Sequence, residues 1–152
     1  MSNSSESDTA FDDFLTLSAL LTGFSRFELT GTGLAHDYFT WLQQAAAIPF
    51  RQLQHDFSAQ PDDEAIRLNW LQATVLTSSS LGPVTRSLLR LWYTGQWVPV
   101  SPAPNDTATF LSDAAWREAL IWQAIHAHPQ AIRQQEFGAW AEPPTAEWGA
   151  HE

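Results

Sequence analysis

The sequence predicts an all-α fold: a single compact helical domain of about five to six helices with an irregular C-terminal tail that contains proline and tryptophan. Three observations predict it. Apolar residues recur at helical spacing in successive segments, helix-starting and helix-ending residues separate these segments, and no segment shows strand-like alternation of useful length. A chain of 152 residues is long enough for one domain with a sizeable core.

The segment 81–97 is predicted to contain the central helix. At about 100° per residue, four apolar residues share one face: Val84, Leu88, Leu91 and Trp92. Leu81, Leu89 and Tyr93 widen that face to about half of the circumference, which is more than a surface helix carries. Gly95 ends the helix, and we expect several other helices to pack around it.

The N-terminal part is predicted to be disordered over residues 1–8, which are polar and acidic, and the helical domain to span residues 9–152. Thr9, with an acidic residue three positions later, is expected to begin the first helix, and Gly23 to end it. Residues 24–33 are predicted to form a loop.

Three further helices are predicted between residues 30 and 77. The first has apolar residues at i, i+4, i+7, i+8 and i+11: Leu34, Tyr38, Trp41, Leu42 and Ala45. The second opens at Pro49 and turns three apolar residues inward: Phe50, Leu53 and Phe57. The third opens at Pro61, where three acidic residues favour the positive end of the helix dipole.

The C-terminal third begins with a proline-containing segment, residues 98–105, which cannot be helical. We predict that it is an ordered surface crossing rather than a domain linker. Ser112 is expected to cap a last helix that ends near residue 126, and the tail from residue 134 onward is predicted to be irregular.

The composition restricts the partners. The formal net charge of −10 disfavours nucleic acid and anionic membrane surfaces. Without cysteine, the chain has no disulfide and no thiolate nucleophile. The first residues lack the basic and apolar stretches of an export signal, and the apolar run of residues 11–21 is too short to span a bilayer, so no direct membrane insertion is expected.

The residues that carry chemistry form no recognisable catalytic pattern. No two of the five histidines have the i, i+4 spacing of a helical metal site, and no phosphate-binding glycine loop occurs. We therefore expect no enzyme activity, metal or cofactor in this chain. The acidic residues 62–64 are interpreted as a helix start. Arg86 and Arg90 could clamp an anion, or they could neutralise acids of the same acidic chain.

The eight tryptophans are the unusual feature of the composition. Tryptophan and tyrosine are enriched at protein interfaces because they bury a large area while one end stays polar. Trp41 and Trp70 are assigned to the core. Trp97, Trp140 and Trp148 lie in proline-containing or irregular segments, where a helical core of this size hardly needs them.

Four segments resemble, in order, motifs of one protein family. They are residues 14–23 (Phe-Leu-Thr-Leu-Ser-Ala-Leu-Leu-Thr-Gly), 89–95 (Leu-Arg-Leu-Trp-Tyr-Thr-Gly), 118–124 (Glu-Ala-Leu-Ile-Trp-Gln-Ala) and 137–144 (Phe-Gly-Ala-Trp-Ala-Glu-Pro-Pro). They are similar to the small subunit of membrane-associated, FAD-dependent sugar dehydrogenases, the sorbitol/fructose dehydrogenase small-subunit family. Each motif is weak alone, but together they are more specific and cover nearly the whole chain.

The resemblance implies a non-catalytic helical subunit that supports folding, flavin loading and export of a large flavoprotein of the glucose-methanol-choline (GMC) type. That partner binds FAD and oxidises the sugar or polyol, and a multihaem cytochrome c subunit passes the electrons to quinone at the periplasmic face of the inner membrane. Family members begin with a twin-arginine signal, which this sequence does not show, so a cytoplasmic location is expected unless the chain is exported with its partner.

The residues expected to bind the partner come from these motifs and from the aromatic segments. They are Trp92, Tyr93, Trp97, Trp122, Gln123, Phe137, Trp140, Pro143, Pro144 and Trp148. Trp140 is the expected anchor, and the alternative is that it folds back onto the helices as core. The alternative function is a free-standing cytoplasmic maturation chaperone for a redox enzyme, which would leave the mature enzyme instead of remaining bound to it.

Overall fold

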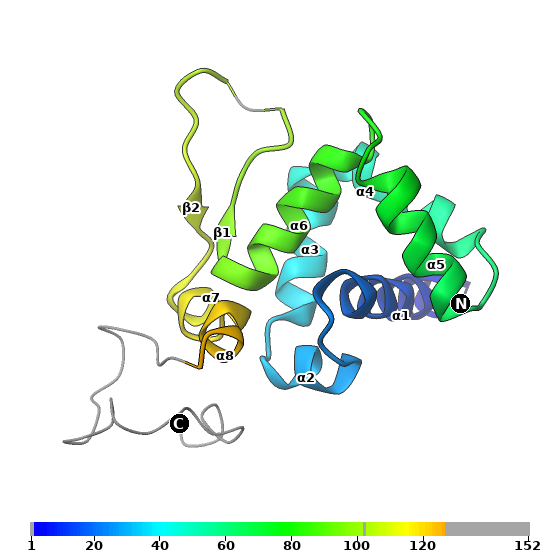
Figure 1. The fold of residues 1–152 in the computed structure, drawn as a ribbon, viewed down its shortest axis with the longest axis horizontal. Helices are drawn as coiled ribbons and strands as arrows, with labels where there is room; N and C mark the ends of the chain where they lie inside the picture. Colours follow the sequence, from blue (N-terminus) through cyan, green and yellow to red (C-terminus); the bar gives the residue numbers. More distant parts are fainter. Residues whose placement is uncertain (1, 102, 127–152) are drawn as a thin grey trace.

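Helices dominate the computed structural model, which describes residues 2–101 and 103–126. The predicted all-α class is confirmed, with one small sheet of two very short strands added (Figure 1). The described elements are α1 (Ser2–Thr22), α2 (Arg26–Gly31), α3 (Ala35–Ala45), α4 (Ala47–Ser58), α5 (Glu64–Trp70), the π-helical segment η1 (Leu71–Val75), α6 (Gly82–Thr94), β1 (Gln96–Trp97), β2 (Thr109–Phe110), α7 (Asp113–Arg117) and α8 (Leu120–Ala124). The predicted irregular tail lies outside the described residues.

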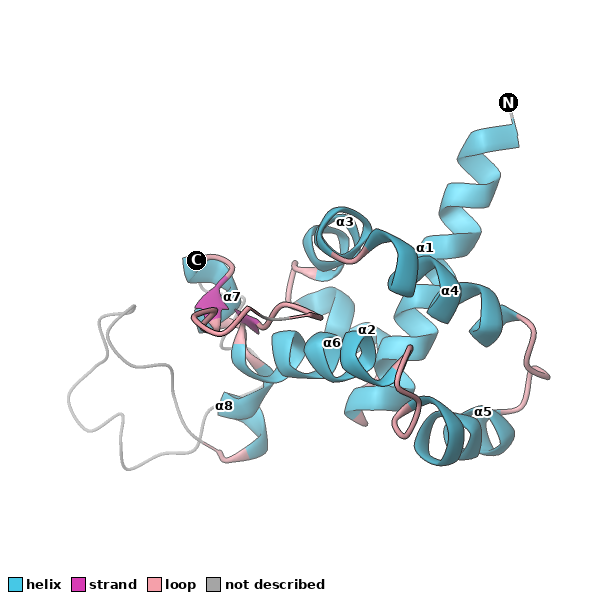
Figure 2. Cartoon of the chain, turned by 90° about the horizontal axis from the view of Figure 1, so that it is seen from above, coloured by secondary structure: helices cyan, strands magenta, loops and turns pink. Residues whose placement is uncertain are grey.

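Helix α6 is the element around which the others pack. It contacts α1, α4, β1, α7 and α8, while α1 also contacts α2, α3, α4 and α5 (Figures 1 and 2). The four residues predicted to form its core face are all buried: Val84, Leu88, Leu91 and Trp92. Helix α6 therefore has neighbours on several sides, as expected, because its wide apolar arc needs more than one element to cover it.

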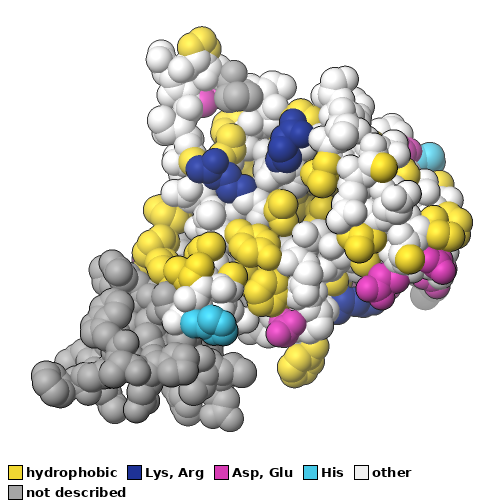
Figure 3. Space-filling model, viewed as in Figure 1, with side chains coloured by type: hydrophobic (Ala, Val, Ile, Leu, Met, Phe, Trp, Pro, Cys, Tyr) yellow, Lys and Arg dark blue, Asp and Glu magenta, His cyan; other side chains and the backbone are white. Residues whose placement is uncertain are grey.

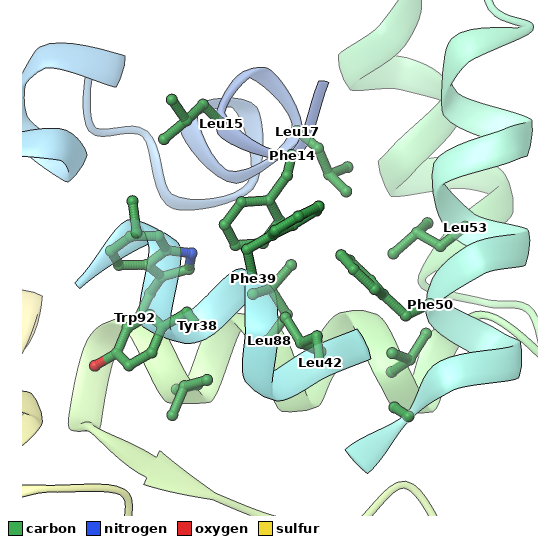
Figure 4. Close-up of a cluster of buried hydrophobic side chains, with 14 of the residues drawn as sticks. Phe14, Leu15, Leu17, Tyr38, Phe39, Leu42, Phe50, Leu53, Leu88 and Trp92 are labelled. Carbon is green, nitrogen blue, oxygen red and sulfur yellow. The ribbon is translucent and has the colours of Figure 1, made fainter. Parts of the chain in front are cut away.

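Aromatic side chains from four helices meet in the core beside α6 (Figure 4). The ring of Trp92 stands edge-on to that of Tyr38 from α3, with centroids 4.8 Å apart, and 6.4 Å from that of Phe14 from α1. Phe39 of α3 and Phe50 of α4 form a second edge-to-face pair at 5.9 Å. Such ring pairs stabilise the fold beyond the contribution of the surface area that they bury, so they favour this packing of the helices.

The N-terminal helix begins earlier than predicted. Residues 2–8, expected to be disordered, belong to α1, which starts at Ser2. The Thr9 hydroxyl donates a hydrogen bond to the Ser5 carbonyl at 2.9 Å, as in a helix interior, and does not cap the helix. No glycine or proline interrupts residues 2–22, so the helix extends outward from its buried part.

The predicted loop 24–33 contains the short helix α2. Ser25 is its N-cap: the hydroxyl accepts from the Glu28 amide at 3.1 Å, and the Glu28 carboxylate accepts from the Ser25 amide at 2.8 Å. This reciprocal capping box satisfies two amides that would otherwise lack partners. With 6 residues, α2 is too short to show an apolar period, although the serine and the glutamate of its box stand in the sequence.

The predicted surface crossing after α6, residues 98–105, is part of the long connection of a β-hairpin. Gln96 pairs with Phe110, and Trp97 with Thr109, in an antiparallel sheet. Strands of two residues are too short to show alternation, which explains why the sequence predicts none. Most of the chain between the strands projects away from the helical body (Figure 1).

The predicted last helix is divided into α7 and α8, because the backbone at Ala119 is extended, with φ −57° and ψ 132°. Ser112 caps α7 as predicted, its hydroxyl accepting from the Ala115 amide at 3.0 Å. This division and α2 raise the number of described α-helices to eight, above the expected five to six. In the described part of the chain, no helix is both long and apolar enough to cross a lipid bilayer.

Candidate functional site

The structure buries two of the residues predicted to bind a partner. Trp92 is 1 % exposed and Trp97 is 6 % exposed, so neither side chain is accessible to a partner protein. The ring of Trp97 packs edge-on against Trp41 of α3, with centroids 6.0 Å apart, because the chain turns at Gly95 and returns along α6. The assignment of both tryptophans to an interface is therefore corrected, and both are core residues.

Five of the predicted residues lie outside the described residues: Phe137, Trp140, Pro143, Pro144 and Trp148. The remaining three are Tyr93, Trp122 and Gln123, and all of them have exposed or half-buried side chains. Trp41 and Trp70, assigned to the core from the sequence, are partly buried and pack against it.

Trp122 belongs to a partly exposed aromatic cluster at the C-terminal end of the described chain. Its ring stands edge-on to that of Trp116 at 4.8 Å, and Trp116 stands edge-on to Phe110 of β2 at 5.0 Å. Phe110 is 49 % exposed, and Ile125, three positions after Trp122, is 56 % exposed. We call these four residues together with Gln123 the aromatic surface. Figure 3 shows hydrophobic side chains gathered in this region, over α7, α8 and the adjoining end of α6.

Two hydrogen bonds position the segments that carry the aromatic surface. The Trp122 indole N–H donates to the Trp116 carbonyl at 2.8 Å, which ties α8 to α7. The Leu111 amide donates to the Gly95 carbonyl at 3.0 Å, which ties the end of β2 to the end of α6. Residues already held in place lose less conformational entropy when they bind, which suits a protein interface.

Gly95 makes this arrangement possible. It ends α6 in the left-handed conformation, with φ 71°. A Cβ atom at this position would lie 2.5 Å from the Ala115 carbonyl oxygen, so α7 can approach α6 this closely only where a side chain is missing.

Tyr93 lies in a second feature, an open hollow beside α6. The hollow has a volume of about 500 Å³ and is lined by Leu21, Arg86, Leu89, Arg90 and Tyr93. We call it the arginine hollow. The Tyr93 hydroxyl donates to the Thr22 carbonyl at 2.7 Å, and its ring stands edge-on to Phe24 at 6.1 Å, so the end of α1 fixes this wall.

The carboxylates at residues 62–64 act as a helix start, as interpreted from the sequence. Asp63 is the N-cap of α5 and accepts from the Ile66 amide at 2.9 Å, while Asp62 pairs with Arg67 at 3.2 Å. Among residues 2–101 and 103–126, no three histidine or acidic side chains are placed to hold a metal ion.

The sequence pattern does not predict three members of the aromatic surface: Phe110, Trp116 and Ile125. Phe110 is brought to Trp116 by the pairing of β1 with β2, which has no periodic signal. The available signal is the serine cap directly after Phe110 and Leu111, which fixes where α7 begins and hence where Trp116 lies.

Comparisons of this chain with protein-family models, curated proteins and solved structures find no match.

Proposed function

We propose that this chain is a non-catalytic small subunit of an FAD-dependent sugar or polyol dehydrogenase complex, in which it binds and stabilises a GMC-type flavoprotein. The observation that carries the proposal is the aromatic surface, where Phe110, Trp116 and Trp122 remain partly exposed although their rings contact one another. Anchors of this kind supply much of the binding free energy at protein interfaces.

The placement of the motif segments supports the same proposal. Residues 89–95 form the last turns of α6 and its glycine end, and residues 118–124 form the α7–α8 junction and α8. Helix α6 contacts both α7 and α8, so the two segments meet beside the aromatic surface. The third described segment, residues 14–23, lies in α1 and at its end, which packs on α6.

In this role the chain supplies a preformed surface on which the flavoprotein folds and takes up FAD. The contact is non-covalent, because the sequence has no cysteine. The remaining parts of the proposal follow from the resemblance: a multihaem cytochrome c subunit accepts the electrons, and the complex works at the periplasmic face of the inner membrane after export with the flavoprotein.

The test is co-expression with a GMC-type flavoprotein, which the proposal expects to be encoded beside this chain's gene. The flavoprotein carries the affinity tag, and the measurements are its yield, its flavin absorbance and the amount of this chain retained after gel filtration. A subunit raises yield and flavin content and stays bound in a fixed ratio. If flavin content rises but the chain does not stay bound, the chain is a maturation chaperone. If the flavoprotein is equally abundant and equally flavinylated without this chain, the proposed function is wrong.

A further inference from the structure

Two cations of the same helix, Arg86 and Arg90, line the arginine hollow. Arg86 and Arg90 are four positions apart on α6, which brings their Cβ atoms to about 5–6 Å from each other. Both side chains are exposed. Figure 3 shows arginine side chains over α6, on the same face of the molecule as the hydrophobic side chains of α7 and α8.

Neither arginine is neutralised by the described part of the chain. Arg86 donates to the Leu76 carbonyl at 2.9 Å, and Arg90 to the side-chain oxygen of Gln96 at 3.3 Å, and both of these acceptors are uncharged. No carboxylate among residues 2–101 and 103–126 lies within 4.0 Å of either guanidinium.

Three of the other described arginines are paired with acids, whereas the exposed Arg51 forms no ion pair with a described residue. The ion pairs are Arg26 with Asp12, Arg67 with Asp62 and Arg117 with Glu118. The sequence has 17 acidic residues against 7 basic ones, so carboxylates are abundant. Two cations that line one hollow and that the described acids leave unpaired are suited to carboxylates from another molecule.

The other three residues that line the hollow present leucine side chains and a tyrosine ring. Leu21 and Leu89 are half-buried, and Tyr93 is fixed by its hydrogen bond to the Thr22 carbonyl. Gly82 adds to this arrangement, because a Cβ atom there would lie 2.9 Å from a terminal nitrogen of Arg86. The absence of a side chain at Gly82 leaves the Arg86 guanidinium room to reach the Leu76 carbonyl.

We propose that the arginine hollow binds an acidic segment of the partner flavoprotein, in which two carboxylates flank an apolar side chain. The planar guanidinium groups of Arg86 and Arg90 match carboxylates in bidentate geometry, and the apolar residue rests on Leu21, Leu89 and Tyr93. The hollow and the aromatic surface then form one interface on a single face. This inference rests on the proposed function and specifies the chemistry of the partner's surface.

The test measures binding of purified flavoprotein to four versions of the full chain at low and high salt. The versions are the wild type, an Arg86→Glu/Arg90→Glu double variant, an Arg86→Lys/Arg90→Lys double variant and, as a control, Arg51→Glu. Arg51 is also an exposed arginine, but it lies on α4 and does not line the hollow. Circular dichroism and the melting temperature of each isolated chain establish that it is folded.

We expect the Arg86→Glu/Arg90→Glu variant to lose affinity by at least about tenfold at low salt, because the charge attraction becomes repulsion. Its affinity should then rise with salt, whereas that of the wild type falls, because salt screens both repulsion and attraction. Arg51→Glu should stay within about twofold of the wild type. An Arg86→Lys/Arg90→Lys variant should retain the salt dependence with weaker affinity, since lysine keeps the charge but loses the bidentate fork.

Three results would overturn the inference. Equal affinity of the Arg86→Glu/Arg90→Glu variant and the wild type shows that the hollow is not in the interface. The isolated double variant could instead melt at a lower temperature while its affinity for the partner is unchanged. If deletion of residues 127–152 lowers the melting temperature in the same way, the occupant is the chain's own C-terminal segment. Conversion of a dimer to a monomer identifies a second copy. If the wild type itself does not bind the flavoprotein, the proposed function fails as well, which separates the two failures.

Discussion

Gly95 is required both for its left-handed backbone conformation and for the close packing of α7. It has φ 71°, and a Cβ atom there would lie 2.5 Å from the Ala115 carbonyl oxygen. The left-handed conformation alone costs an alanine about 1 kcal/mol. Displacement of α7 adds to this cost, so Gly95→Ala should lower the free energy of unfolding by more than about 2 kcal/mol in denaturant titration.

Substitutions of two other glycines separate the cost of the left-handed conformation from the cost of displacing α7. Gly33 has φ 75° but open space around it, so Gly33→Ala should show only the conformational cost. Gly31 has open space and lies in helix α2, so Gly31→Ala should be neutral or slightly stabilising. A Gly95→Ala loss no larger than that of Gly33→Ala would contradict the close approach of α7.

Asp13 gives a residue-scale prediction for the effect of pH. Burial raises the pKa of its carboxyl above the ordinary 3.8, Arg67 opposes this change and Asp12 adds to it. The folded state therefore binds a proton more readily than the unfolded state, and Asp13 costs stability as pH rises from 3.8 through the raised pKa.

Asp13→Asn removes that titration. The unfolding free energy of the variant minus that of the wild type should increase through this pH window and then become constant. Chemical denaturation at a series of pH values measures the difference. A difference that is flat, or that falls as pH rises, would show that burial of Asp13 does not dominate its pKa.

At the scale of the element, α6 is the helix that the sequence predicts best. Its apolar arc is wide, its glycine end is explicit, and the residues on its face are buried as expected. Leu88→Ala should cost about 2–5 kcal/mol in unfolding free energy, because a fully buried leucine leaves a cavity. The neighbouring Leu89 is half-buried, so Leu89→Ala should cost less. A loss under about 1 kcal/mol for Leu88→Ala would mean that α6 is not the centre of the core.

Shorter elements show where prediction from sequence stops. Helix α2 depends on a capping box, and the two strands depend on two pairs of facing residues. Neither feature produces a periodic pattern of apolar residues that could be detected in the sequence. The extended backbone at Ala119 divides a segment whose apolar spacing suits one helix. Local hydrogen bonds decide these elements, whereas the apolar pattern decides the long helices.

At the scale of the whole molecule, the same limit applies to the interaction surfaces. The sequence predicts that tryptophans face a partner, but which ones depends on tertiary contacts. Trp97 is buried because the turn at Gly95 brings it back to Trp41, while Trp122 stays half-exposed because the break before α8 orients it toward Trp116. Which tryptophans are exposed therefore depends on tertiary contacts that the sequence pattern does not contain.

The central claim is that the aromatic surface binds the flavoprotein, and one matched pair of variants tests it most directly. Phe110 is 49 % exposed within that surface, and Phe27 on α2 is 87 % exposed outside it. Both can be changed to alanine with little effect expected on the fold, which the melting temperature of each isolated chain checks. The measurement is the dissociation constant of each variant for the purified flavoprotein. The account predicts that Phe110→Ala weakens binding by about tenfold or more while Phe27→Ala stays within about twofold of the wild type. Equal affinities for the two variants, or a larger loss for Phe27→Ala, would contradict it.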